Sequence, residues 1–354
     1  MGLALPKFMA IITEIPYGYP SMPKFAAIIL KGQIMQSLIV SQNEAGQRLD
    51  KLLSKYLNLA EKSFLYKMMR KKNITLNGKK CDGSEKLVQG DEVKLFLSDE
   101  TIGKFSQVKL PEVKKVSLNI IYEDEHILLV NKPAGMLSQK ARESDESLVE
   151  YMIDYLVSSG QLSTEQLRSF RPSVCNRLDR NTSGLVVGGK SLAGLQLMSA
   201  SFKDRSIHKY YQCVVKGKIS ERQVITGYLT KSEASNQVTV HKQQVPGSVP
   251  IVTEYEPVQY HEGYTLLRIT LITGRTHQIR AHLSSIGHPI AGDYKYGDSR
   301  VNEEAKRLYH IHSQLLHSYQ VIFPELPEPL SYLSGQSFFA PLPKTFSKIC
   351  KDWR

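Results

Sequence analysis

"CNRLDRNTSGLVVGGKS", residues 175–191, joins a charged turn to an apolar run. One carboxylate, Asp179, lies between Arg177 and Arg180, and arginines on both sides would favour its ionised form. The Asn-Thr-Ser-Gly that follows is typical of a turn, and "GLVVGG" is typical of a buried strand. The pattern therefore places Asp179 at the edge of a sheet. Because ion-paired aspartates are common in loops, this spacing alone leaves a catalytic and a structural role equally open.

A second stretch, rich in arginine and histidine, is "GRTHQIRAHLSSIGHPIAGDYKYG", residues 274–297. His277 and His282 are five positions apart and have no carboxylate at ligand spacing, so the stretch does not favour a metal site. A helix here would leave Arg275 and Arg280 available to phosphate or carboxylate. We expect that helix to turn its apolar side chains inward, namely Ile279, Leu283 and Ile286.

A third stretch, "HKYYQCVVKG" at residues 208–217, predicts a strand. Tyr210 and Tyr211 are adjacent in it, so alternation turns one ring inward and the other outward, and ordinary core packing would explain either ring. From residue 117 onward, similar β-type runs alternate irregularly with a few helices, one of them at "SLVEYMIDYLVSSG". The irregular order predicts an α+β fold with a mixed or antiparallel sheet.

A small basic segment, residues 47–80, precedes these stretches. Its apolar spacing predicts two helices, and "ITLNGKK" predicts a strand that runs into an Asn-Gly turn. Ten Lys and Arg against two Asp and Glu give the segment a charge of +8 (10 − 2). The cations at the end of the second helix form either a solvated face or a phosphate-binding surface, and their density favours binding. These cations are Lys67, Arg70, Lys71 and Lys72.

The whole chain has 354 residues, 41% of them hydrophobic, and a formal net charge of +12. This composition suits a globular protein of two domains whose partner is a polyanion, either nucleic acid or an anionic membrane face. No apolar run is long enough for a membrane helix. Four scattered cysteines without metal-ligand spacing indicate reduced thiols in a cytoplasmic protein.

We expect four segments along the chain. Residues 98–116 are polar and weakly periodic, which is typical of a linker. Residues 35–97 before it form the small basic module, and residues 117–354 after it form the larger domain. Residues 1–34 mix short apolar runs with Pro, Gly and Tyr, so we expect a poorly ordered extension or a misassigned start.

The motifs together resemble the RluA-type pseudouridine synthase family over residues 117–345. "NRLDRNTSGLVV" is similar to its central motif, "YYQCVVKG" to its tyrosine strand, and "GRTHQIRAHLSSIGHPIAGDYKYG" to its arginine motif. "VNKPAGML" and "FFAPLP" resemble its first strand and its closing segment. Residues 47–97 resemble a small RNA-binding domain named after a ribosomal protein of the small subunit, which often accompanies the family.

The resemblance implies roles for individual residues. Asp179 would be the catalytic aspartate, Tyr211 the tyrosine that stacks on the target base, and Arg280 the arginine that pairs with the aspartate. Arg177 would fill the space that the flipped nucleotide leaves. Asn176 departs from the family, many members of which have histidine there, and this concerns RNA contacts rather than the chemistry. The residues expected to bind RNA are Arg177, Arg180, Lys67, Arg70, Lys71, Lys72, Arg275 and His277.

The implied activity is isomerisation of uridine to pseudouridine in RNA, which requires neither a cofactor nor a metal. We expect a monomer that acts on large-subunit ribosomal RNA, with transfer RNA as the alternative substrate. A non-catalytic RNA-binding assembly factor is a rival function, but the presence of Asp179, Tyr211 and Arg280 argues against it. A hydrolase using Asp179 and His277 is a second rival, and it lacks the paired carboxylates or metal ligands that such chemistry uses.

Overall fold

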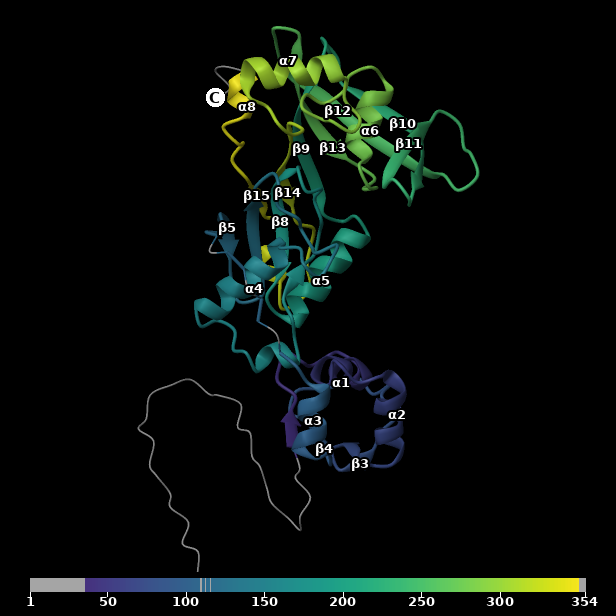
Figure 1. The fold of residues 1–354 in the computed structure, drawn as a ribbon, viewed down its shortest axis with the longest axis vertical. Helices are drawn as coiled ribbons and strands as arrows, with labels where there is room; N and C mark the ends of the chain where they lie inside the picture. The colour runs from purple at the N-terminus through teal and green to yellow at the C-terminus, as the bar shows by residue number, and fades with distance from the viewer. Residues whose placement is uncertain (1–35, 109, 112, 115, 350–354) are drawn as a thin grey trace, which may run out of the picture.

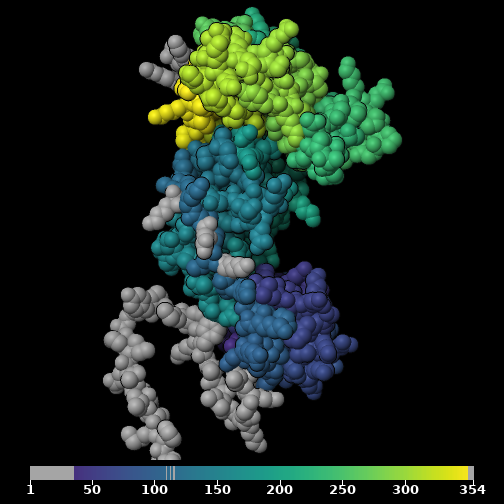
Figure 2. All heavy atoms as spheres, in the orientation of Figure 1, coloured from purple at the N-terminus to yellow at the C-terminus, as the bar shows by residue number. Residues whose placement is uncertain are grey.

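The computed structural model describes residues 36–108, 110–111, 113–114 and 116–349, in an elongated molecule with a small module at one end (Figure 1). The prediction for residues 1–34 lies outside these described residues. Figure 2 shows the small module, in purple and blue, as a distinct body against one end of the larger domain. Among the described residues, no helix is both long enough and apolar enough to cross a membrane.

The small module packs helices against an antiparallel sheet of strand order β1-β4-β2-β3. The apolar faces predicted for its first two helices are confirmed, because their residues lie in one buried cluster. The predicted Asn-Gly turn is confirmed too, with Asn77 and Gly78 at φ values of 51° and 73° between two paired strands. The elements are β1 (Gln36–Ile39), α1 (Leu49–Tyr56), α2 (Lys62–Arg70), β2 (Ile74–Leu76), β3 (Lys79–Lys80), β4 (Glu92–Leu95) and α3 (Asp99–Phe105).

Helix α3 corrects the expectation of a linker over residues 98–116. Ser98 caps the helix by accepting a hydrogen bond from the backbone nitrogen of Thr101, and Ile102 is buried in the core of the module. Phe64 and Phe105 have ring centroids 4.7 Å apart, which ties α3 to α2. The first part of the expected linker is therefore a helix that packs on the module.

The larger domain is built on a twisted sheet of order β11-β10-β12-β13-β9-β14-β8-β6-β5, with β15 beside β14 and β7 beside β8. The pair β8–β14 is parallel and the other pairs are antiparallel, so the predicted mixed sheet and α+β class are confirmed. Its strands are β5 (Ile120–Glu123), β6 (Ile127–Lys132), β7 (Ser173–Val174), β8 (Ser183–Gly189), β9 (His208–Lys216), β10 (Gln223–Ser232), β11 (Gln237–His241), β12 (Val249–His261), β13 (Tyr264–Leu271), β14 (Leu316–Ile322) and β15 (Ser337–Phe339). Its α-helices are α4 (Leu148–Ser158), α5 (Leu192–Lys203), α6 (Gln278–Ser285), α7 (Ser299–Tyr309) and α8 (Phe346–Ile349).

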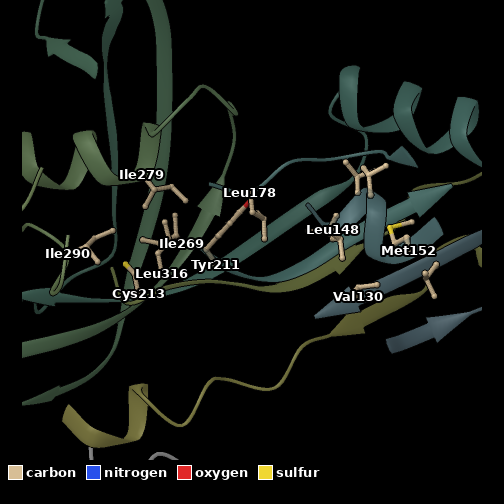
Figure 3. Packing of buried hydrophobic residues seen from close by; sticks show 14 of the residues in the cluster. Val130, Leu148, Met152, Leu178, Tyr211, Cys213, Ile269, Ile279, Ile290 and Leu316 are labelled. Carbon is tan, nitrogen blue, oxygen red and sulfur yellow. The ribbon is translucent and has the colours of Figure 1, made fainter. Parts of the chain in front are cut away.

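Strand β8, the apolar run of the opening stretch, is buried on both faces. Val186 lies in one cluster with Met152 of α4, while Leu185 and Val187 lie in another with Met198 of α5. Figure 3 shows the first cluster extending along the sheet to Tyr211 and Ile279. Covering both faces explains why β8 is continuously apolar rather than alternating.

A glycine at the start of β8 allows the parallel pairing with β14. Gly184 has φ of +110°, and a Cβ atom there would come within 2.2 Å of the carbonyl oxygen of Ser318 on β14. Another residue would therefore separate the two strands. This contact fixes the start of β8. It therefore also fixes the point at which the loop that carries Asp179 joins the sheet.

The module contacts the larger domain around Arg168, which lies in a short 3-10 helix (Gln166–Arg168). The guanidinium carbon is 4.3 Å from the ring centroid of Tyr56, and its nitrogens donate to Ser106 Oγ at 2.7 and 3.1 Å. Two hydrogen bonds join the same surfaces: Ser169 Oγ to Glu44 Oε1 (2.5 Å) and the backbone nitrogen of Leu192 to Asn43 Oδ1 (2.6 Å).

Candidate active site

Asp179 lies in the loop between β7 and β8, and this loop is held from both sides. Ser138 Oγ bonds the backbone oxygen and nitrogen of Leu178, at 2.8 and 2.9 Å. The carbonyl oxygen of Asp179 accepts from the backbone nitrogen of Thr182 at 3.0 Å. The predicted turn therefore fixes the backbone of Asp179. Its side chain remains 28% exposed to solvent.

Lys132 supports the same loop from below. The side chain is fully buried, and Nζ donates to the carbonyl oxygens of Pro133, Met136 and Arg180 at 2.9, 2.8 and 3.1 Å. Burial lowers the pKa of Lys132 to about 7, while the nearby charge of Asp179 opposes that shift. Sequence reasoning missed this residue, because a lysine at the end of a strand is normally exposed and its carbonyl partners come from separate loops.

The charge partner of Asp179 is Arg280 of α6. Arg280 Nη1 donates to Asp179 Oδ2 at 2.8 Å, and Nε and Nη2 donate to the two carboxylate oxygens of Asp293 at 2.7 and 2.9 Å. Arg280 thus joins two carboxylates with its planar fork. Neither Arg177 nor Arg180 forms an ion pair with Asp179 among the described residues, so the interpretation that the flanking arginines hold Asp179 is wrong.

Asp293 is the most deeply buried of the three charged side chains Asp179, Arg280 and Asp293. Its side chain is 1% exposed, and that of Arg280 is 8% exposed. Burial alone would raise the pKa of Asp293, but hydrogen bonds from Arg280 and its charge outweigh that effect and lower the pKa below its usual value. Asp293 therefore stays ionised and fixes the guanidinium that faces Asp179. The sequence analysis predicts no role for Asp293. The signal for one was a Gly-Asp pair close to arginines in the sequence.

His277 lies beside Asp179 at the start of α6, with its Nε2 3.8 Å from Asp179 Oδ2. Its Nδ1 is 2.8 Å from the hydroxyl of Tyr296, which itself accepts from the backbone nitrogen of Val238. Whether Nδ1 donates to this hydroxyl or accepts from it depends on the imidazole tautomer. Burial lowers the pKa of His277 despite the opposing charge of Asp179, so the ring is neutral at physiological pH.

Tyr211 comes from β9 and closes the site from the sheet side. Its side chain is only 6% exposed and lies in the main core cluster (Figure 3). Tyr210 is half-buried, with the guanidinium carbon of Arg268 4.5 Å from its ring centroid. The predicted inward and outward tyrosines are thereby confirmed. Burial raises the pKa of Tyr211 to about 12, so its hydroxyl stays neutral.

Helix α6 turns Ile279 and Leu283 inward as predicted, but Ile286 is 37% exposed and that prediction is wrong. The helix ends at Ser285, and Ile286 belongs to the turn that follows. Asn176, the departure from the family pattern, bonds the backbone of β8 through Leu185 and Val187 at 3.2 and 2.8 Å.

Asp179, Tyr211 and Arg280 line one cleft of about 990 Å³. Of the described residues that line it, eight are Lys or Arg and one, Asp179, is acidic. Such a surface complements a polyanion and directs its positive field at a single carboxylate. The cations are Lys140, Arg177, Arg180, Lys209, Lys231, Arg275, Arg280 and Lys295.

The predicted RNA-binding residues fall into two groups. Arg177, Arg180, Arg275 and His277 all line the cleft with Asp179. The second group lies on the small module, is exposed and has no ion pair with any described residue; it comprises Lys67, Arg70, Lys71 and Lys72. Four cleft cations were not predicted. Three of them come from separate elements, namely Lys140, Lys209 and Lys231, and Lys295 lies in the stretch 274–297 without a predicted role.

The chain is similar to several known proteins. A family model described as RNA pseudouridylate synthase matches residues 126–285. A ribosomal large subunit pseudouridine synthase C of Vibrio parahaemolyticus is 32% identical over 277 residues, which cover 75% of this chain and 81% of that protein. An uncharacterized RNA pseudouridine synthase of Mycoplasma genitalium is 31% identical over 300 residues, covering 83% and 91% of the two chains. The solved structure of human RNA pseudouridylate synthase domain containing 4 matches 65% of this chain and 90% of its own, with a TM-score of 0.51 and 20% identity, and so supports the fold.

Proposed function

The chain belongs to the RNA pseudouridylate synthase family, of RluA type, and we propose that it isomerises uridines of large-subunit ribosomal RNA with Asp179 as the catalytic residue. The observation that carries the proposal is the single carboxylate in a basic cleft, held by a buried arginine. The ribosomal substrate is supported by relatives named ribosomal large subunit pseudouridine synthase C and D.

The reaction breaks the bond between sugar and base, turns the base and rejoins it through carbon 5. The target atoms are shielded in a base stack, so the nucleotide has to leave the stack and enter the cleft. The ring of Tyr211 at the cleft wall offers a stacking partner for the flipped base, and the exposed Arg177 can occupy the vacated space. Cleft cations bind the phosphates on either side.

Asp179 has to be ionised whether it acts as a nucleophile or removes a proton. Arg280 donates to one of its oxygens, and Asp293 prevents that guanidinium from turning away. The second carboxylate oxygen of Asp179 has no hydrogen bond with a described residue, which leaves it for the substrate. Isomerisation transfers no electrons and no external group, so we expect no cofactor.

The small module is proposed to bind structured RNA through Lys67, Arg70, Lys71 and Lys72. Their exposure and the absence of ion pairs with described residues leave all four charges to solvent or phosphate. The module would add affinity and select the RNA without taking part in the chemistry.

Tritium release from RNA labelled at carbon 5 of uracil tests the proposal. Transcripts of large-subunit ribosomal RNA and of transfer RNA are compared, with wild type, Asp179→Asn and the exposed control Asp204→Asn. We expect release from ribosomal RNA with wild type and control, and a loss of about 10⁴-fold with Asp179→Asn. Release from transfer RNA alone would mean that transfer RNA, and not ribosomal RNA, is the substrate. No release from either RNA would favour an assembly factor. Cleavage of the RNA strand would indicate a hydrolase.

A further inference from the structure

The segment Asp293–Tyr296, between α6 and α7, is fixed at three of its four side chains. Asp293 binds Arg280 and also accepts from the backbone nitrogens of Lys295 and Tyr296, at 2.9 and 3.1 Å. Lys295 Nζ donates to the carbonyl oxygen of Asn236 at 2.5 Å. Tyr296 bonds His277, and the preceding backbone is held as well, through Asn302. The backbone around the remaining residue, Tyr294, therefore has little freedom.

Tyr294 differs from its neighbours in having no partner among the described residues. It lines the cleft with Asp179, yet its side chain is 54% exposed. Within the part of the chain that the structure describes, it has no hydrogen bond, ion pair, ring contact or cation contact. A large aromatic ring on a rigid backbone, left open inside a basic cleft, is arranged for a ligand that has its own flat face.

We propose that Tyr294 is a stacking platform for an unpaired nucleobase next to the flipped uridine. When the target nucleotide leaves the stack, a neighbouring base loses one of its stacking partners, and an exposed ring can replace it. Lys231, Lys295 and Arg275 also line the cleft and supply cations for the phosphates of the same strand. Lys295 follows Tyr294 directly, so one strand can meet a ring and a cation on adjacent residues.

The two tyrosines of the cleft then have separate tasks. Tyr211 is 6% exposed and belongs to the core, so it can meet only a base that enters the site fully. Tyr294 is reachable from solvent and suits a base that stays in the strand. This inference rests on the proposed function for its RNA ligand, but base stacking can be measured without turnover.

The test separates stacking from catalysis with two RNAs. A short oligouridine with one central 2-aminopurine reports stacking by quenching of its fluorescence, and the tritium-labelled transcript reports turnover. The variants are Tyr294→Ala, Tyr294→Phe and Tyr294→Trp, and the control is Tyr260→Ala, an exposed tyrosine of β12 outside the cleft lining. We expect Tyr294→Ala to lose the quenching and to raise KM about tenfold with kcat little changed, because stacking contributes per base on that scale. Phe, Trp and the control should stay near wild type.

Three outcomes would overturn the inference. Unchanged quenching and KM in Tyr294→Ala would mean that no base stacks there. A Phe variant as defective as the Ala variant would assign the contact to the hydroxyl group instead of the ring. A loss in kcat alone would indicate a structural effect on the Asp293 anchor. If wild type quenches the oligouridine but releases no tritium, the stacking site stands and the proposed function fails.

Discussion

The catalytic cleft and the small module both concentrate positive charge, yet their cations meet different surroundings. In the cleft, Arg280 is 8% exposed and lies between two carboxylates. On the module, Lys67, Arg70, Lys71 and Lys72 are exposed and have no ion pair with a described residue. Short-range interactions in a dry site depend on geometry, whereas exposed charges act over several ångströms and are screened by salt. The two regions should therefore respond differently to substitution, pH and ionic strength.

The largest difference should come from removing the buried guanidinium. Arg280→Met leaves Asp293 buried and unpaired, so we expect the free energy of unfolding to fall by about 4 kcal/mol and turnover to be lost. Urea denaturation measures the first effect and tritium release the second. The control is Arg222→Met, which removes an exposed arginine paired with Glu254 and should cost less than about 1 kcal/mol. Equal costs for the two variants would show that the cleft pair is no different from a surface pair.

Acid should weaken the framework of the cleft through His317. This residue of β14 is fully buried and bonds Ser183 Oγ at 2.8 Å, at the parallel pairing with β8. Burial lowers its pKa from 6.5 to about 4, despite a hydrogen bond to Ala340. The unfolded chain binds a proton near pH 6.5 and the folded chain only near 4, so stability is present above 6.5 and is lost as the pH falls towards 4.

Between pH 7 and pH 5 this group should cost about 2 kcal/mol. The measurement is urea denaturation of wild type and His317→Gln at both pH values. The variant should be less stable at pH 7 and should lack this part of the pH dependence. Identical slopes for the two proteins would assign the acid sensitivity to other groups.

Substitutions in the module should change the affinity for RNA and not the rate of the chemical step. Replacing Lys67, Arg70, Lys71 and Lys72 together by Ala should raise KM for ribosomal RNA about tenfold and leave kcat unchanged. The salt dependence of binding should also become shallower, by about one unit of slope for each cation that contacts a phosphate. As a control, a triple substitution of exposed cations on α7, at the far end of the molecule (Figure 1), should change neither quantity; it replaces Arg300, Lys306 and Arg307. A lowered kcat in the quadruple variant would contradict the separation of the two regions.

The helices and strands that depend on local sequence patterns could be predicted in both regions. Apolar spacing gave α1 and α2, and the continuous run of β8 indicated a buried strand, because both signals depend on neighbours within a few residues. Helix α3 was missed because it is short and mostly polar, with Ile102 buried in the core and Phe105 partly buried against it. Its stability comes from packing on the module, which residues 99–105 do not reveal by themselves.

The site was harder to predict, because its contacts join distant segments. Asp179 and Arg280 are 101 residues apart, so spacing pointed to the wrong arginines and only the family resemblance suggested the right one. In the sequence, Asp293 looks like an ordinary turn residue and Lys132 like the ordinary end of a strand. Their burial results from the way the sheet brings the Asp179 loop, α6 and the turn after β6 together.

Substitution of Arg168 should have the smallest effect of these variants. It tests whether the cleft and the module bind RNA as one surface. Its guanidinium covers the ring of Tyr56 and bonds Ser106, so Arg168→Ala should free the module to reorient. Losing a fixed orientation lowers the effective concentration of the second site, and we expect KM to rise about fivefold. The increase should appear only with RNA long enough to reach both regions, and a short stem-loop that fills the cleft should bind as before.

Glu165→Ala is the matched control, because it removes the ion pair on the other side of Arg168 and leaves the contact with the module intact. Combining Arg168→Ala with the quadruple module variant decides the interpretation. If Arg168 acts by orienting the module, it should have no further effect once the module's cations are gone. An additional fivefold loss in the combined variant would mean that Arg168 stabilises the larger domain itself and that the module binds RNA independently of its orientation.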